Sequence, residues 1–124
     1  MPVRSEYNKE NNFVEVVYTG NISNEELIEA VLASVHLARE KGSFLFLADC
    51  TKMTGGHSIV DLYELISLYE KLEIPRNMRE AIILPVIPEP VDKVRFYETA
   101  STNRGYTVRI FDDREQALVW LISK

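Results

Sequence analysis

Apolar and polar residues alternate along the chain with two distinct periods. Near the start, Val3, Ser5 and Tyr7 alternate with charged residues, and 13–19 is rich in β-branched and aromatic residues. Two asparagines separate these segments, so the pattern predicts a hairpin of two strands. Apolar runs follow at 44–48 and 81–86, and Tyr106, Val108 and Ile110 alternate with polar residues in a further strand over 106–111. Continuous runs of this kind are typical of central strands that are covered on both faces.

Between these strands the apolar residues recur with the period of a helix. Ser23-Asn-Glu-Glu26 is a capping box, which predicts the start of the first helix, and Gly42 predicts its end. Ser58 and Asp61 have the same spacing, so we expect a second helix over 58–73.

Two further helices complete the predicted order. Pro90 suits the first turn of a helix over 91–100, and Asp112 with Glu115 predicts a capping box for the last helix. The order β-β-α-β-α-β-α-β-α predicts an α/β fold. We expect a mixed, mostly parallel sheet of four to five strands, with an N-terminal β-hairpin and four flanking helices.

Composition narrows the class of protein. A chain of 124 residues with a net charge of −5 is the size of one domain, spanning 1–124, and lacks the positive charge of a nucleic-acid binder. The same charge disfavours attachment to anionic membranes. The only cysteine, Cys50, cannot form an internal disulfide, and no apolar run is long enough to cross a bilayer. We therefore expect a cytoplasmic protein with no membrane span.

Candidate chemistry concentrates after the third predicted strand. Gly55, Gly56, His57 and Ser58 form a loop before a helix, where free backbone amides and the helix dipole favour an anion or a phosphorylated Ser58. The plainer alternative, which we favour, is a turn that needs glycine and a serine that caps the helix. The loop lacks the Gly-Lys-Ser/Thr ending of a nucleotide-binding P-loop.

Asp49 and Thr51 lie where that strand is predicted to end, the position at which α/β proteins place ligand groups. They could form one rim of a site with Asn103 and Arg104, which could hold an anionic partner. The alternative for Asp49, which we favour, is that it accepts hydrogen bonds from its own loop, and for Arg104 that it lies near a helix C-terminus.

The second predicted helix is apolar over an arc wider than one sheet face requires, so it must be covered on two sides. Its cover could be a neighbouring helix, a second subunit or an apolar ligand. The candidate interaction or ligand face comprises Leu62, Tyr63, Leu65, Leu68, Tyr69, Phe96 and Tyr97.

Taken in order, several short segments resemble the STAS fold of anti-sigma-factor antagonists, and more closely the small SpoIIAA-like bacterial proteins. They are Leu47-Ala-Asp49-Cys-Thr51, Leu62, Phe96-Tyr97-Glu98, Asn103-Arg104-Gly105-Tyr106, Phe111-Asp112, Ala117 and Trp120-Leu121. The resemblance implies a four-to-five-stranded mixed sheet with no metal or organic cofactor. In the antagonists, a serine in an Asp-Ser-Ser-Gly motif is phosphorylated. Here the matching stretch is His57-Ser58-Ile59-Val60, which keeps only the hydroxyl of that motif.

The sequence therefore favours a non-catalytic regulatory or protein-interaction module, which could be a homodimer. The main alternative is a carrier or sensor of a small apolar molecule or lipid held between the sheet and the helices. A hydrolase or transferase that uses Asp49, His57 and Ser58 ranks last, because adjacent residues rarely align as nucleophile and base. Two histidines without a cysteine pair also make a zinc site improbable, so no metal is expected.

Overall fold

The computed structural model describes residues 2–123, which form five strands and four helices in the predicted order. The strands are β1 (Val3–Asn8), β2 (Phe13–Asn21), β3 (Leu45–Gly55), β4 (Arg79–Ile83) and β5 (Thr107–Phe111). The helices are α1 (Asn24–Lys41), α2 (Ile59–Lys71), α3 (Val91–Asn103) and α4 (Arg114–Ile122).

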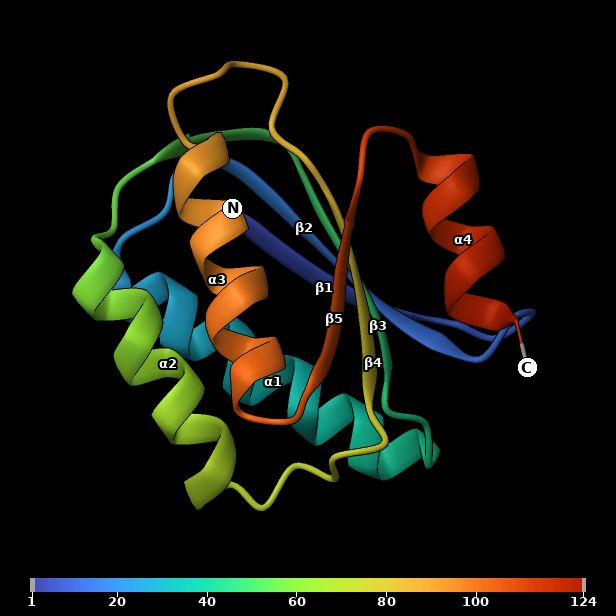
Figure 1. Cartoon of the computed structure of the whole chain (residues 1–124). Helices are drawn as coiled ribbons and strands as arrows, with labels where there is room; N and C mark the ends of the chain where they lie inside the picture. The colour runs from blue at the N-terminus through green and yellow to red at the C-terminus, as the bar shows by residue number, and fades with distance from the viewer. Residues whose placement is uncertain (1, 124) are drawn as a thin grey trace.

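The strands form one sheet in the order β1-β2-β3-β4-β5. The β1–β2 hairpin is antiparallel, and every later pair is parallel. Figure 1 shows α1, α2 and α3 on one face of the sheet and α4 on the other. The predicted α/β class, the hairpin and the mixed sheet with four helices are confirmed.

The two faces of the sheet bury cores of different size. The larger core lies under α1, α2 and α3 and contains side chains such as Val16, Phe46 and Ile82. The smaller one joins Leu47, Ala81 and Ile83 to α4. Because successive side chains of a strand point to opposite faces, residues of β3 and β4 alternate between the two cores. This double burial explains the continuous apolar runs.

The caps of α1 and α2 agree with the predictions. Ser23 and Ser58 each accept a hydrogen bond from the backbone amide three residues later, and Gly42 ends α1 in the left-handed conformation. The capping box predicted at Asp112 was wrong by one residue. Asp113 is the N-cap of α4, and its Oδ1 accepts from the Gln116 amide over 2.8 Å.

Strand β3 continues well beyond the predicted end of its apolar run. Its second half pairs with the end of β2, from Thr19–Lys52 to Asn21–Gly55. One irregularity in register precedes this pairing, between Val17 and Thr19, and a second lies within it, between Gly20 and Asn21. Met53 is buried in this half, whereas Lys52 and Thr54 are exposed. The segment predicted as a loop after Asp49 is therefore mostly strand, and only 56–58 connects β3 to α2.

Candidate functional site

A cavity of about 50 Å³ lies between the sheet and helices α1, α2 and α3. Its apolar lining includes Leu27, Met53, Leu62, Leu65, Ile82 and Val94. A second cavity of about 30 Å³ lies closer to α1. Tyr18, Ala48, Tyr69 and Glu80 line both cavities, so these four side chains form the wall between them.

A chain of hydrogen bonds crosses this wall. The hydroxyl of Tyr97 on α3 donates to Oε1 of Glu80 on β4 over 2.6 Å. The hydroxyl of Tyr69 on α2 lies 2.5 Å from that of Tyr97, so Tyr69 donates to Tyr97 in turn. Burial raises the pKa of both tyrosines, which keeps their hydroxyls protonated and able to donate. The chain thus joins both helices to the centre of the sheet.

Glu80 is an unusual residue for this position. Its side chain points to the face covered by the helices, between Phe46 of β3 and Val108 of β5 in the sheet register. It keeps some accessible surface because it borders the cavities, yet it lies beneath the helix layer. Desolvation raises its pKa from 4.5 to about 7, although the hydrogen bond from Tyr97 acts in the opposite direction.

His57 and Lys93 both line the larger cavity and contact each other. The His57 Nδ1 lies 3.0 Å from the carbonyl oxygen of Ile22. Since a carbonyl only accepts, Nδ1 carries the proton in this pair. The ammonium of Lys93 donates to the His57 carbonyl over 2.7 Å. These contacts hold the connection between β3 and α2 against both α1 and α3.

The glycines of this connection allow a close backbone approach. The Ile22 amide donates to the Gly55 carbonyl over 2.8 Å. A Cβ on Gly56 would lie 2.6 Å from the Ile22 nitrogen, and Gly56 has φ of 102°. Here Gly56 packs against the turn before α1, which favours the structural alternative over an anion cradle.

Ser58 uses its hydroxyl in the cap of α2. Its Oγ accepts from the Asp61 amide over 3.1 Å, and the Asp61 carboxylate accepts from the Ser58 amide over 2.9 Å. Both partners are therefore satisfied within the helix terminus. The side chain of Ser58 is exposed. Phosphorylation at Ser58 stays a prediction.

The four residues predicted to share one rim lie at two separate places. Asp49 accepts from the amide and the hydroxyl of Thr51 over 3.0 and 2.7 Å, on the sheet face opposite the cavity. Asn103 is the last residue of α3, and Arg104 is its C-cap. Arg104 contacts Glu70 in the last turn of α2, which lies about 18 Å along that helix from Ser58. The prediction of one shared rim was wrong, because α3 runs antiparallel to the strands.

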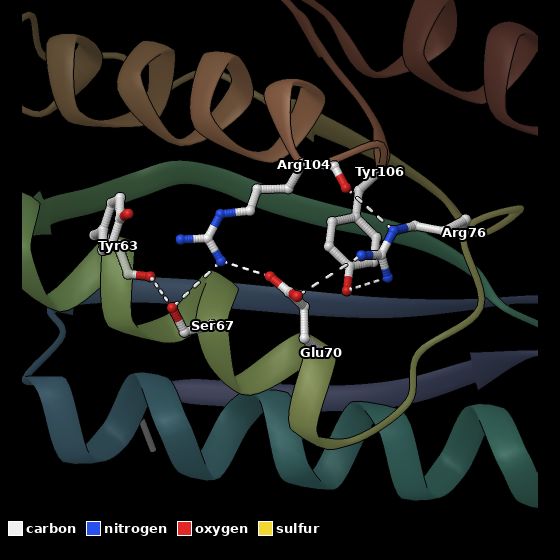
Figure 2. Close-up of polar contacts among 6 residues, drawn as sticks. All are labelled: Tyr63, Ser67, Glu70, Arg76, Arg104 and Tyr106. Atoms are coloured by element: carbon white, nitrogen blue, oxygen red, sulfur yellow. Dashed lines mark hydrogen bonds and ion pairs between the residues drawn. The ribbon is translucent and has the colours of Figure 1, made fainter.

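Arg104 instead belongs to a surface network that joins three segments (Figure 2). Its Nη1 lies 2.6 Å from Glu70 Oε1 and 3.4 Å from Ser67 Oγ. Arg76 lies 3.9 Å from the other oxygen of Glu70 and donates to the Tyr106 hydroxyl over 2.8 Å. This network fastens the end of α2 to the segment between α3 and β5. Glu70, the only carboxylate of this network, already pairs with both Arg76 and Arg104.

The predicted interaction face is largely internal. Leu62, Leu65, Tyr69 and Tyr97 are buried, and Leu68 and Phe96 are half-buried. Only Tyr63 is exposed, with 53% of its surface accessible. The arc is covered within this chain by α3 and the sheet. Its four buried members all line the larger cavity.

Sequence reasoning missed Glu80, the central polar residue of the site. The fourth strand was predicted to begin at Ala81, whereas β4 begins at Arg79. Extending the alternation backwards from Ile82 would have placed Glu80 on the same covered face. That position for a carboxylate is the signal that could have revealed the site.

Two further features of the described residues concern metals and membranes. Within 2–123, no three His, Cys, Asp or Glu side chains are grouped so that they could hold a metal ion. Over the same range, no helix has the length and apolar character needed to cross a membrane.

Comparison with known proteins identifies the fold. No family model and no curated protein matches this sequence. Among solved structures, the chain is similar to an uncharacterized protein of the DUF3478 family with a SpoIIAA-like fold, from Shewanella loihica PV-4. The match has a TM-score of 0.63 at 20% identity and covers 96% of this chain and 91% of the other. The chain therefore has a SpoIIAA-like fold of the STAS type, as the resemblance of its segments predicted.

Proposed function

We propose that this chain is a non-catalytic binding module that holds a small, largely apolar molecule between the sheet and helices α2 and α3. The observation that carries the proposal is the cavity itself. Four residues of the predicted ligand face line it, together with the hydrogen-bonded Glu80. Apolar walls with a few convergent polar groups are typical of small-molecule sites.

The size of the cavity limits the ligand. A cavity of about 50 Å³ has room for a few water molecules. A larger ligand fits only if it also takes up the neighbouring 30 Å³ cavity, or if side chains of α2 and α3 move. We therefore favour a compact molecule over a long-chain lipid.

The engagement of the candidate nucleophiles supports a non-catalytic role. Ser58 is held in a helix cap, and His57 donates to a backbone carbonyl. Burial raises the pKa of the Cys50 thiol, with smaller contributions from Glu80 and Asp49, so the reactive thiolate is disfavoured. No hydrogen bond within residues 2–123 pairs the Ser58 hydroxyl or the Cys50 thiol with a general base, as an activated nucleophile would require.

Native mass spectrometry of freshly purified protein tests this proposal. We expect a retained mass on the wild type that disappears on denaturation. The matched control is Ala48→Val, which adds volume at the wall of both cavities and should reduce the retained fraction. Absence of any retained mass, or an adduct unaffected in the folded Ala48→Val protein, would contradict the proposal.

A second candidate function is the regulatory or protein-interaction module, and one observation favours it. Ile59, Val60 and Tyr63 are 47%, 64% and 53% exposed in the first two turns of α2. Adjacent exposed apolar side chains of this size are typical of contact surfaces. Light scattering after size-exclusion chromatography tests self-association. This candidate predicts a dimer that Val60→Glu converts to a monomer, and a wild-type monomer at high concentration would remove the homodimer.

A further inference from the structure

One oxygen of Glu80 has no hydrogen-bond partner within residues 2–123. Oε1 accepts from Tyr97, whereas Oε2 makes no such contact with these residues. A carboxylate can accept several hydrogen bonds. Within residues 2–123 the only polar side-chain atom that is both fully buried and unpaired is Ser101 Oγ, so the unpaired Oε2 of the half-buried Glu80 keeps accessible surface and is free to accept. Because Glu80 lines both cavities, a molecule inside them is the available partner for Oε2.

The groups around Glu80 do not neutralise its charge. Those that line the cavities beside it are Tyr18 of β2, Cys50 of β3, Ser34 of α1, Tyr69 of α2 and Tyr97 of α3. All five side chains are neutral in these surroundings, and the flanking residues in the sheet register, Phe46 and Val108, are apolar.

The other polar groups near the cavities are already engaged. Ser34 donates to the Val31 carbonyl over 3.0 Å, and Lys93, which also lines the larger cavity, donates to the His57 carbonyl over 2.7 Å. No ion pair in the described part of the chain includes Glu80. A donor that enters the cavity would therefore meet an acceptor with no competing protein donor at Oε2.

We infer that Glu80 is the polar anchor of the site and selects an apolar molecule that carries one hydroxyl group, whose O–H donates to Oε2. The inference rests on the proposed function, because it names the ligand class of the same cavity. The apolar body would lie against Leu62, Leu65 and Val94, which belong to α2 and α3. An otherwise similar molecule that can only accept hydrogen bonds would leave Oε2 unpaired.

The selectivity should be large enough to measure. A hydrogen bond to a charged group contributes about 1.5–3 kcal/mol, so its loss weakens binding about tenfold or more. Sites built to bind a substrate hydroxyl reject analogues without the donor for the same reason.

The test compares n-butanol with diethyl ether, which are isomers of similar size, only one of which donates. Each is titrated into the wild type at about pH 8, where Glu80 is largely ionised, and amide NMR shifts of Met53, Leu65 and Val94 report binding in the cavity. We expect n-butanol to bind about tenfold more tightly than the ether. Glu80→Gln should reduce the preference to near equality, since the amide can donate to either probe. The matched control Glu64→Gln, an exposed carboxyl on α2, should keep it.

The outcomes separate the inference from the proposed function. If neither probe shifts the cavity amides, the small-molecule site itself is wrong. If both bind equally to the wild type, or if the preference survives in Glu80→Gln, the cavity binds ligands but Glu80 does not select them.

Should Glu80→Gln fail to fold, a titration of the wild type at about pH 5 replaces it, because protonation of Glu80 should weaken the preference for n-butanol there. A preference that stays the same between the two pH values would overturn the inference. Where Glu80→Gln folds, its preference between the two probes should not change with pH. That result would exclude His57 as the source of the pH dependence in the wild type.

Discussion

At the residue scale, the Glu80 carboxyl couples the interior of the protein to pH. Its folded-state pKa of about 7 lies above the ordinary value of 4.5, so the folded chain binds this proton more tightly than the unfolded chain. The resulting stability is fully present below about pH 4.5 and is lost as the pH rises through about 7. The window of loss therefore includes neutral pH.

Replacement of Glu80 by glutamine should remove this dependence. The free energy of unfolding of Glu80→Gln, measured relative to the wild type by urea denaturation, should improve by about 1–3 kcal/mol between about pH 5 and pH 8. Glu64→Gln, whose carboxyl is exposed, serves as the control and should show no such change. If the difference in unfolding free energy between Glu80→Gln and the wild type stayed constant across this pH range, it would contradict the burial of an ionisable Glu80.

Cys50 is a second residue whose chemistry follows from its position. It is 6% exposed beneath the helix layer, and burial raises the pKa of its thiol. We expect the native protein to react with a thiol reagent only as fast as it unfolds, and the urea-denatured protein to react at once. Rapid labelling under native conditions would show that the cavity admits reagents without unfolding.

Residue-scale sequence reasoning succeeded where a local pattern determines the outcome. The caps at Ser23 and Ser58 follow from three-residue spacings, which are independent of the rest of the fold. Glu80 was missed because the fourth strand was predicted to begin two residues too late, although the alternation from Ile82 places Glu80 on the covered face. Its partner Tyr97 lies on α3, and no local pattern predicts that this hydroxyl meets the carboxylate.

At the element scale, the cap of α2 separates a structural from a regulatory role of Ser58. Ser58→Ala should lower the free energy of unfolding by about 1 kcal/mol, because it removes the acceptor for the Asp61 amide. Ser58→Asp should retain most of the stability, since aspartate is also a good N-cap. Urea denaturation of both variants checks this, and equal losses would argue against the cap as the role of the Ser58 hydroxyl.

The connection between β3 and α2 depends on close packing at Gly56. Gly56→Ala should destabilise the protein by about 2–4 kcal/mol, because its Cβ meets the Ile22 backbone and its φ is positive. Gly20→Ala is the matched control. Gly20 also has a positive φ, but a Cβ there has open space, so about 1 kcal/mol is expected. Thermal or urea unfolding that gives equal losses would contradict the proposed contact.

Element boundaries were predicted less well than element types. The second half of β3 contains Thr51, Lys52 and Thr54, whose polar side chains are typical of a loop. It becomes strand because the end of β2 pairs with it, across irregularities that no local pattern encodes. The error in the predicted rim was avoidable. A helix between two parallel strands must run back along the sheet, so the end of α3, with Asn103 and Arg104, lies at the opposite edge from the end of a strand.

At the scale of the whole molecule, the order of elements was sufficient to predict the architecture. Alternating strands and helices allow few topologies, and the similarity to the SpoIIAA-like structure at 20% identity agrees with the expected one. The location of a cavity is a different matter. It depends on how Tyr18, Tyr69 and Glu80 meet from separate elements, so only the assembled structure could reveal it.

The central claim is that the space around Glu80 is a binding site for a small hydroxyl-bearing molecule. The most direct measurement is a crystal structure of the protein at about pH 8 with n-butanol in the crystal. Our account predicts the alcohol in the cavity under α2 and α3, with its oxygen within hydrogen-bond distance of Glu80 Oε2. A fully packed interior with Oε2 bonded to a protein atom, or an alcohol bound only on the outer surface, would contradict it.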